Sequence, residues 1–204
     1  MYDCIIPWSG GVESTALVSD CVRRGLKPYC FHLVMNGHWV KQIEAVKKMS
    51  EMLNVKVDIV HYNNTTRSLD NQVTKDHYVQ LWQGGSPPMF FFWTNIAHMI
   101  QIDNPQINRI YYGYNGGVID REDGMGDKHT DWVDKHFRHI EDVCAMLGIH
   151  TKMSAPLGHM SKLEQWQIIP EHIQEHVHTC VHPTERHCGK CMKCKEMGYM
   201  KSVL

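Results

Sequence analysis

Four cysteines near the carboxyl end of the chain have the spacing of metal ligands. They lie within one short segment, in the pattern Cys-x7-Cys-x2-Cys-x2-Cys: Cys180, Cys188, Cys191 and Cys194. Zinc binds four thiolates in a closed tetrahedral shell, which leaves no open position for a catalytic water. We therefore predict a structural Zn²⁺ site at these cysteines. An iron–sulfur cluster and a Cys₃His shell that uses a nearby histidine are the alternatives.

A second segment, residues 9–15, has the composition of an anion-binding turn. Its sequence is Ser-Gly-Gly-Val-Glu-Ser-Thr, and it follows a short apolar run. Paired glycines let the backbone approach a ligand closely, and successive N–H groups can form a nest for an anion. If a helix begins here, its amino terminus adds unpaired donors and a partial positive charge. The segment is therefore predicted to bind phosphate.

This turn is not one of the two commonest phosphate-binding motifs. The Walker pattern G-x-x-x-x-G-K-[ST] is absent, and so is the dinucleotide fingerprint G-x-G-x-x-G. An ordinary strand-to-helix turn capped by a serine is the alternative interpretation.

The elements that would carry this turn alternate in type. Apolar or alternating patterns predict strands at residues 2–8, 27–35, 55–61, 109–114 and 149–154. Helical spacing predicts helices at residues 12–24, 39–53, 89–102, 132–147 and 161–169, with a loop at 115–130. Ser161 followed by Glu164 has the pattern of a capping box. This alternation predicts an α/β fold with a parallel sheet and helices on its faces.

Length and charge restrict the classes of protein further. The chain has 204 residues and a net charge of -1. This length suits one domain with a small appended segment. We place the α/β domain at residues 1–170 and the cysteine-rich segment at 171–204. The weak net charge gives no general attraction for nucleic acid or for an anionic membrane, so direct nucleic-acid binding is not expected.

The other cysteines indicate the redox compartment of the protein, and one long uncharged stretch has to be tested as a membrane span. Four cysteines lie in apolar segments and are predicted to be small buried hydrophobic residues: Cys4, Cys21, Cys30 and Cys144. This distribution indicates a reducing, cytoplasmic setting. Residues 77–102 carry no charge, but Gly84, Gly85 and a pair of prolines interrupt the stretch. We expect a buried helix there and no membrane span.

The phosphate loop and the cysteine segment together resemble one family over nearly the whole chain. Residues 9–14 resemble the S-G-G-x-D-S signature of PP-loop ATPases, with Glu13 in the place of aspartate. With the cysteine segment, the chain resembles the 7-cyano-7-deazaguanine synthases, the QueC family. Three further matches are Asn36-Gly37-His38 with Glu44 downstream, Tyr112-Gly113-Tyr114-Asn115, and Ala155-Pro156-Leu157 followed by Ser161-Lys162.

The resemblance implies a Rossmann-like fold of the adenine nucleotide alpha hydrolase type and an ATP-dependent reaction. Family members convert 7-carboxy-7-deazaguanine and ammonia to 7-cyano-7-deazaguanine, or to its amide, after adenylation of the carboxylate. ATP would enter with Mg²⁺. The implied catalytic residues are Lys162, Glu13 and Ser14. The implied nucleotide-binding residues are Trp8, Ser9, Gly10, Gly11, Val12, Glu13, Ser14, Thr15, His38, Gly113, Asn115 and Lys162. The resemblance is compatible with a homodimer.

Two segments depart from the family pattern. Pro88-Met89-Phe90 stands near the place of an arginine–asparagine pair, and residues 120–128 replace a Y-P-D-C-R motif. Both would shape the substrate end of the site. Two other functions are therefore considered: a PP-loop enzyme that thiolates tRNA or makes lysidine, and a zinc-knuckle binding module without enzymatic activity.

Overall fold

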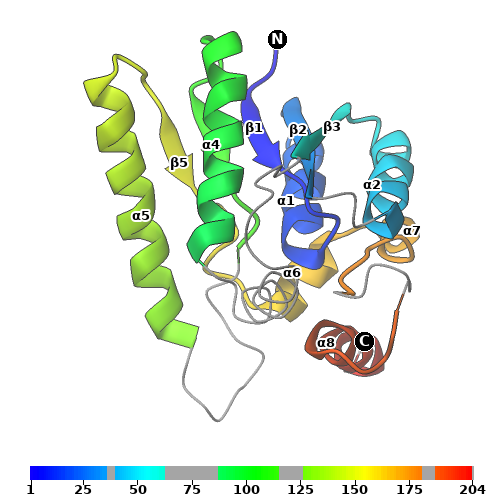
Figure 1. Cartoon of the computed structure of the whole chain (residues 1–204). Helices are drawn as coiled ribbons and strands as arrows, with labels where there is room; N and C mark the ends of the chain where they lie inside the picture. The colour runs from blue at the N-terminus through cyan, green and yellow to red at the C-terminus, as the bar shows by residue number, and fades with distance from the viewer. Residues whose placement is uncertain (36–39, 63–86, 115–125, 181–186, 204) are drawn as a thin grey trace, which may run out of the picture.

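Five parallel strands form the centre of the protein. The computed structural model describes residues 1–35, 40–62, 87–114, 126–180 and 187–203 (Figure 1). The strands are β1 (Cys4–Pro7), β2 (Pro28–Met35), β3 (Val57–Tyr62), β4 (Arg109–Tyr111) and β5 (Lys152–Ser154). They lie in the order β3-β2-β1-β4-β5, and each neighbouring pair is parallel. The predicted α/β class is confirmed.

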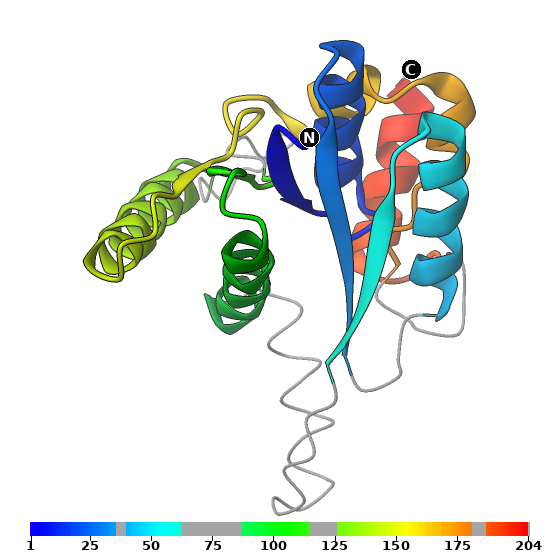
Figure 2. The same cartoon turned by 90° about the horizontal axis from the view of Figure 1, so that it is seen from above.

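Seven described helices accompany the sheet. They are α1 (Val12–Arg23), α2 (Val40–Leu53), α4 (Pro87–Asp103), α5 (Gly126–Met146), α6 (Lys162–Ile168), α7 (Glu171–Gln174) and α8 (Met192–Val203). Figure 2 shows α4 and α5 on one side of the sheet and α2 and α8 on the other. None of the described helices is long and apolar enough to cross a membrane.

Alternation along β1 divides the core into two layers. Successive side chains of a strand point to opposite faces of the sheet. Cys4 and Ile6 therefore pack with α1, α2 and the carboxyl-terminal helices, whereas Ile5 packs with Phe31, Ile110 and residues of α4 and α5.

The carboxyl-terminal segment shares the first of these layers. Ile173 of α7 and Met197 and Met200 of α8 are buried in the same hydrophobic cluster as Val12 and Ala16 of α1. The division predicted at residue 170 falls between α6 and α7, and the described residues on both sides contribute to one core. The tail is therefore placed against the helix that begins at the phosphate loop.

Three details differ from the sequence-based expectations. Helix α5 begins at Gly126, although a loop was predicted through residue 130, because adding a turn to an existing helix costs less than starting one. The carboxyl-terminal half of α4 is not fully buried, since Met99 and Ile102 are 65% and 59% exposed. Helix α8 was not predicted, because its apolar residues are few and its packing comes from distant parts of the chain.

Candidate functional site

The phosphate loop lies at the point where the order of the strands reverses. β1 pairs with β2 on one side and with β4 on the other. In open parallel sheets, ligands bind in the crevice outside the carboxyl ends of the strands at such a point. Residues 8–11 connect β1 to α1 here, and residues 112–114 leave β4 beside them. The topology alone therefore selects this loop as the candidate binding site.

The two glycines of the loop have different conformations. Gly10 has φ of 83°, in the left-handed region that favours glycine, and a Cβ there would stand 2.9 Å from Val46 Cγ2. Gly11 has φ of −78° and ψ of 174°, and its nearest neighbour to a Cβ is Ser9 Oγ at 3.4 Å. Gly10 is thus required by the fold, whereas a Cβ at Gly11 would make only ordinary van der Waals contacts.

Hydroxyl groups fix the loop from inside. The Ser14 and Ser9 hydroxyl oxygens are 2.9 Å apart, and Ser14 Oγ accepts the Ser9 N–H at 3.2 Å. The Gly11 N–H points to Ser9 Oγ at 3.3 Å. These bonds hold both ends of the turn together at the amino terminus of α1.

Three of the residues assigned to the nucleotide have side chains in the core. Trp8, Val12 and Thr15 are fully buried. Trp8 Nε1 donates to Thr15 Oγ1 at 3.0 Å, beneath the loop. Their side chains support the turn, and only their backbone could reach a ligand. Two other assigned residues, His38 and Asn115, lie outside the described residues.

Lys162 reaches the loop from α6. The predicted capping box is confirmed: the Ser161 hydroxyl accepts the Glu164 N–H, and the Glu164 carboxylate accepts the Ser161 N–H. This cap starts α6 at Lys162, which is 4% exposed. Its Nζ lies 3.0 Å from Glu13 Oε1 and 2.6 Å from Glu196 Oε2. A buried ammonium therefore stands between the phosphate loop and α8.

The charges of this cluster favour ionised forms. Burial of the Glu13 carboxyl by itself would raise its pKa, but the ammonium groups of Lys162 and Lys193 lower it to about 2. Burial would lower the pKa of Lys162, yet the two carboxylates raise it above its ordinary value. Lys162 is therefore held in its protonated form beside the loop, paired with two carboxylates.

The carboxyl-terminal segment reaches the loop through Glu196 and Lys162, and it also contacts the loop directly. The His178 backbone N–H donates to the Gly10 carbonyl oxygen at 2.9 Å. Neither His178 nor Glu196 was identified from the sequence as part of the nucleotide end. The available signal was their position two residues from a metal-ligand cysteine, Cys180 and Cys194 respectively.

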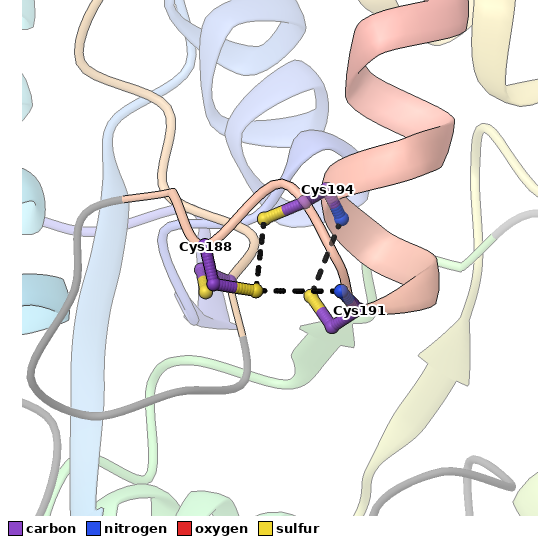
Figure 3. Close-up of side chains that lie close together, drawn as sticks. Cys188, Cys191 and Cys194 are labelled. Atoms are coloured by element: carbon purple, nitrogen blue, oxygen red, sulfur yellow. Dashed lines mark hydrogen bonds between the residues drawn. The ribbon is translucent and has the colours of Figure 1, made fainter.

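The four predicted metal ligands do come together. The Sγ atoms of Cys180, Cys188, Cys191 and Cys194 all lie within 4.8 Å of one another. Figure 3 shows three of them facing each other where α8 begins. The Cys188 and Cys194 Sγ atoms are 3.9 Å apart. A tetrahedral site with zinc–sulfur bonds of about 2.3 Å requires sulfurs roughly 3.8 Å apart, so this geometry fits a single tetrahedral metal ion.

Backbone donors support this cysteine turn. The Cys191 N–H donates to Cys188 Sγ at 3.3 Å, and the Cys194 N–H donates to Cys191 Sγ at 3.4 Å. The Cys191 N–H is the main reason why the pKa of the Cys188 thiol is lowered to about 6. A thiol that ionises readily is a better metal ligand. The other four cysteines are free and buried, as predicted.

The fold and site together define an α/β protein with a glycine-rich loop where the strand order reverses and a cysteine cluster that could hold a metal ion. The family model for the queuosine biosynthesis protein QueC matches residues 3–201. The chain belongs to this family, and the assignment supports an enzyme.

Similar proteins are found at low identity. A 7-cyano-7-deazaguanine synthase of Myxococcus xanthus (strain DK1622) is 22% identical over 206 residues, covering 91% of this chain and 86% of that protein. Among solved structures, the U34-tRNA thiolase NcsA from Methanococcus maripaludis aligns with a TM-score of 0.49 at 13% identity, covering 100% of this chain and 67% of that one. A 4-thiouridine synthetase in complex with RNA and ATP aligns with a TM-score of 0.47 at 13% identity, covering 98% and 49%.

Proposed function

We propose that this protein is an ATP-dependent carbon–nitrogen ligase that makes 7-cyano-7-deazaguanine, or its amide, from 7-carboxy-7-deazaguanine and ammonia. The family match over residues 3–201 supports the reaction class, and the Myxococcus relative carries this activity in its name. The observation that carries the proposal is the buried Lys162 ammonium, 3.0 Å from Glu13 in the loop that follows the central strand.

The proposed first step is adenylation. The substrate carboxylate attacks the α-phosphorus of ATP, a P–O bond breaks, and pyrophosphate leaves. The backbone N–H groups at the amino terminus of α1 would bind the departing pyrophosphate. Lys162 would offset the charge that develops on it, and Glu13 would hold the Lys162 side chain in place. The Ser14 hydroxyl would donate to a phosphate oxygen after leaving Ser9.

The next steps add nitrogen and remove water. Ammonia attacks the acyl carbon, AMP leaves, and the amide forms with loss of a proton. The amide oxygen then attacks the α-phosphorus of a second ATP, pyrophosphate leaves, and the nitrogen loses one proton. Loss of AMP and of the second N–H proton gives the nitrile. Mg²⁺ that accompanies ATP would neutralise part of the phosphate charge.

We also propose that the cysteine site binds one zinc ion. The sulfur–sulfur distances match a single tetrahedral ion, whereas the irons of a cluster would hold their cysteines further apart. The segment 171–204 would then be the zinc-binding part of the chain. The reducing, cytoplasmic setting, the homodimer and the absence of direct nucleic-acid binding stay predictions.

The experiment is an analysis of products by chromatography and mass spectrometry. The wild-type protein is incubated with ATP, Mg²⁺, ammonium and 7-carboxy-7-deazaguanine, and each component is omitted in turn. AMP, pyrophosphate and the amide or nitrile are expected only when the acid is present. The Lys162→Met variant should give much less AMP. ADP as the main nucleotide product would contradict the proposal.

A further inference from the structure

We propose that the four-cysteine site is energetically coupled to the nucleotide site, and that Glu196 is the positioning residue that carries this coupling. Metal bound by the cysteines would hold Glu196 and His178 in place, and these two residues would in turn set the positions of Lys162 and Gly10. The inference rests on the proposed nucleotide-binding function, and it adds a role for the metal beyond stabilising the tail.

The first connection runs through the backbone of the loop. His178 is 2% exposed, and its N–H donates to the Gly10 carbonyl oxygen at 2.9 Å. This bond fixes the orientation of the Gly10 peptide, which has a left-handed φ. Cys180 follows two residues later and is fully buried. A metal bound by Cys180 would therefore restrain residues 178–180, which hold the loop through the His178 N–H.

The second connection runs through side chains. Glu196 lies two residues after Cys194, in the first part of α8. Its Oε2 is 2.6 Å from Lys162 Nζ and 3.6 Å from Lys193 Nζ. The Lys162 ammonium is thus held between Glu13, from the phosphate loop, and Glu196, from the metal-binding segment. Movement of α8 would release one side of this cation.

The two connections are joined to each other at the cysteines. The segment of His178 and Cys180 and the start of α8 face each other, with the Thr179 hydroxyl 3.4 Å from the Lys193 carbonyl oxygen. Between them stand four sulfur atoms within 4.8 Å. Deprotonated thiols at this separation repel one another, and a divalent cation replaces the repulsion with four bonds. A bound metal would therefore hold both the His178–Gly10 hydrogen bond and the Glu196–Lys162 ion pair in place.

Thermodynamic linkage makes this proposal testable from both sides. If the metal strengthens ATP binding by some factor, ATP must strengthen metal binding by the same factor. The dissociation constant of ATP is measured by calorimetry, without acid or ammonium, for metal-loaded protein and for protein stripped with a chelator and then exchanged into buffer. In parallel, the apparent metal affinity is measured by competition with a chromogenic chelator, with and without ATP. We expect equal changes, of roughly 5- to 150-fold.

Variants of Glu196 identify the residue that carries the coupling. Metal-loaded Glu196→Ala should bind ATP more weakly, and its metal affinity should respond less to ATP. Glu196→Gln keeps a hydrogen-bond acceptor for Lys162 and should restore much of the response. Glu171→Ala, an exposed acid in α7, is the matched control and should behave as the wild type does. Because these variants stay metal-loaded, they test the proposal even if stripped protein unfolds.

The outcomes separate this inference from the proposed synthase reaction. Equal ATP affinity with and without metal, or an unchanged response in Glu196→Ala, would overturn the coupling and leave the synthase assay untouched. Reciprocal coupling without formation of amide or nitrile would overturn the proposed substrate and leave the coupling standing. A metal-loaded protein that binds neither ATP nor pyrophosphate would overturn both.

Discussion

The backbone of Gly113 lies directly against the backbone of Ser14. A Cβ built on Gly113 would stand 2.4 Å from both the amide nitrogen and the Cα of Ser14. The chain leaving β4 thus touches the first turn of α1 at the mouth of the phosphate loop. The family resemblance predicts that Gly113 lies at the nucleotide, and the structure adds a steric reason for glycine at this position.

Gly113→Ala should therefore destabilise the protein and displace the loop. The atoms that the new methyl group meets are backbone atoms, so they cannot move aside cheaply, and overpacking of this kind costs about 1–3 kcal/mol. The control is Gly198→Ala in α8, where a Cβ meets nothing within 4 Å and alanine should stabilise the helix by about 0.5–1 kcal/mol. Urea unfolding of both variants provides the measurement. An unchanged midpoint for Gly113→Ala would contradict the described contact.

The two loop glycines provide a matched pair of substitutions. Gly11→Val should fold normally, because its backbone angles suit any residue and its Cβ would meet only ordinary van der Waals contacts. Its side chain would occupy the space in front of the N–H groups, so ATP affinity should fall by at least about tenfold, or roughly 1.4 kcal/mol. Gly10→Val should instead lower stability, because of its φ of 83° and the contact with Val46. Calorimetry with ATP and thermal unfolding distinguish the two effects, and unchanged ATP affinity in Gly11→Val would place the phosphate site elsewhere.

Lys162→Met should damage both catalysis and stability. Without the ammonium, the Glu13 and Glu196 carboxylates face each other with 22% and 23% of their side chains exposed. Removing one partner of a buried ion pair costs about 3–5 kcal/mol, and this partial exposure should reduce the loss to roughly 2 kcal/mol. Turnover should fall more than ATP affinity does, since the lysine acts mainly on the developing charge. Adding Glu13→Gln should restore part of the stability, and a further loss would argue against repulsion between the carboxylates.

Ionisation of the Glu13 carboxyl should also make the free energy of unfolding depend on pH in the acid range. Its pKa is lowered from 4.5 to about 2, so its stabilising contribution is complete above 4.5 and is lost as the pH falls towards about 2. The free energy of unfolding of the wild type should decline through this interval more steeply than that of Glu13→Gln. Urea titrations at several pH values measure both proteins under the same conditions, and parallel curves would contradict the ion pair.

Metal content tests the cysteine site. Purified wild-type protein should contain one zinc ion per chain, and Cys188→Ser should lose it, because three ligands leave the shell open. The tail should then unfold locally while the sheet stays folded. Cys144→Ala is the control, since Cys144 is a buried residue of α5 and is not among the four grouped cysteines. Elemental analysis provides the answer: iron would indicate a cluster, and metal-free wild type would refute the site.

Short stretches of sequence predicted much of this fold, because hydrophobic periodicity and helix caps depend on residues that are close together in the chain. The five strands, the helix start at Val12 and the capping box of Ser161 and Glu164 were all readable from short stretches of sequence. The cysteine ligands were also readable, because their spacing is itself the signal. The boundaries of these elements shifted by a few residues, as at Gly126, where an established helix continues through a polar segment.

The parts that escaped prediction depend on contacts between distant residues. Lys162 and Glu196 are thirty-four positions apart, and no periodicity links them. The helical state of α8 depends on Met197 and Met200 entering a core built by α1. The glycine-rich motif also does not show which side of it faces solvent. Trp8 and Thr15, which the resemblance implies at the nucleotide, stay predictions; the structure adds that their side chains are hydrogen-bonded to each other in the interior.

The contact between His178 and Gly10 also has a consequence for the order in which the protein matures. A ribosome makes the phosphate loop before the cysteine segment, so a nascent chain carries the loop before its partner exists. The strands and their flanking helices can assemble during that time, but the Gly10 peptide is not yet held and Lys162 lacks Glu196. Nucleotide can stabilise only a state that binds it. Competence to bind ATP should therefore arise only after the cysteine segment has been made.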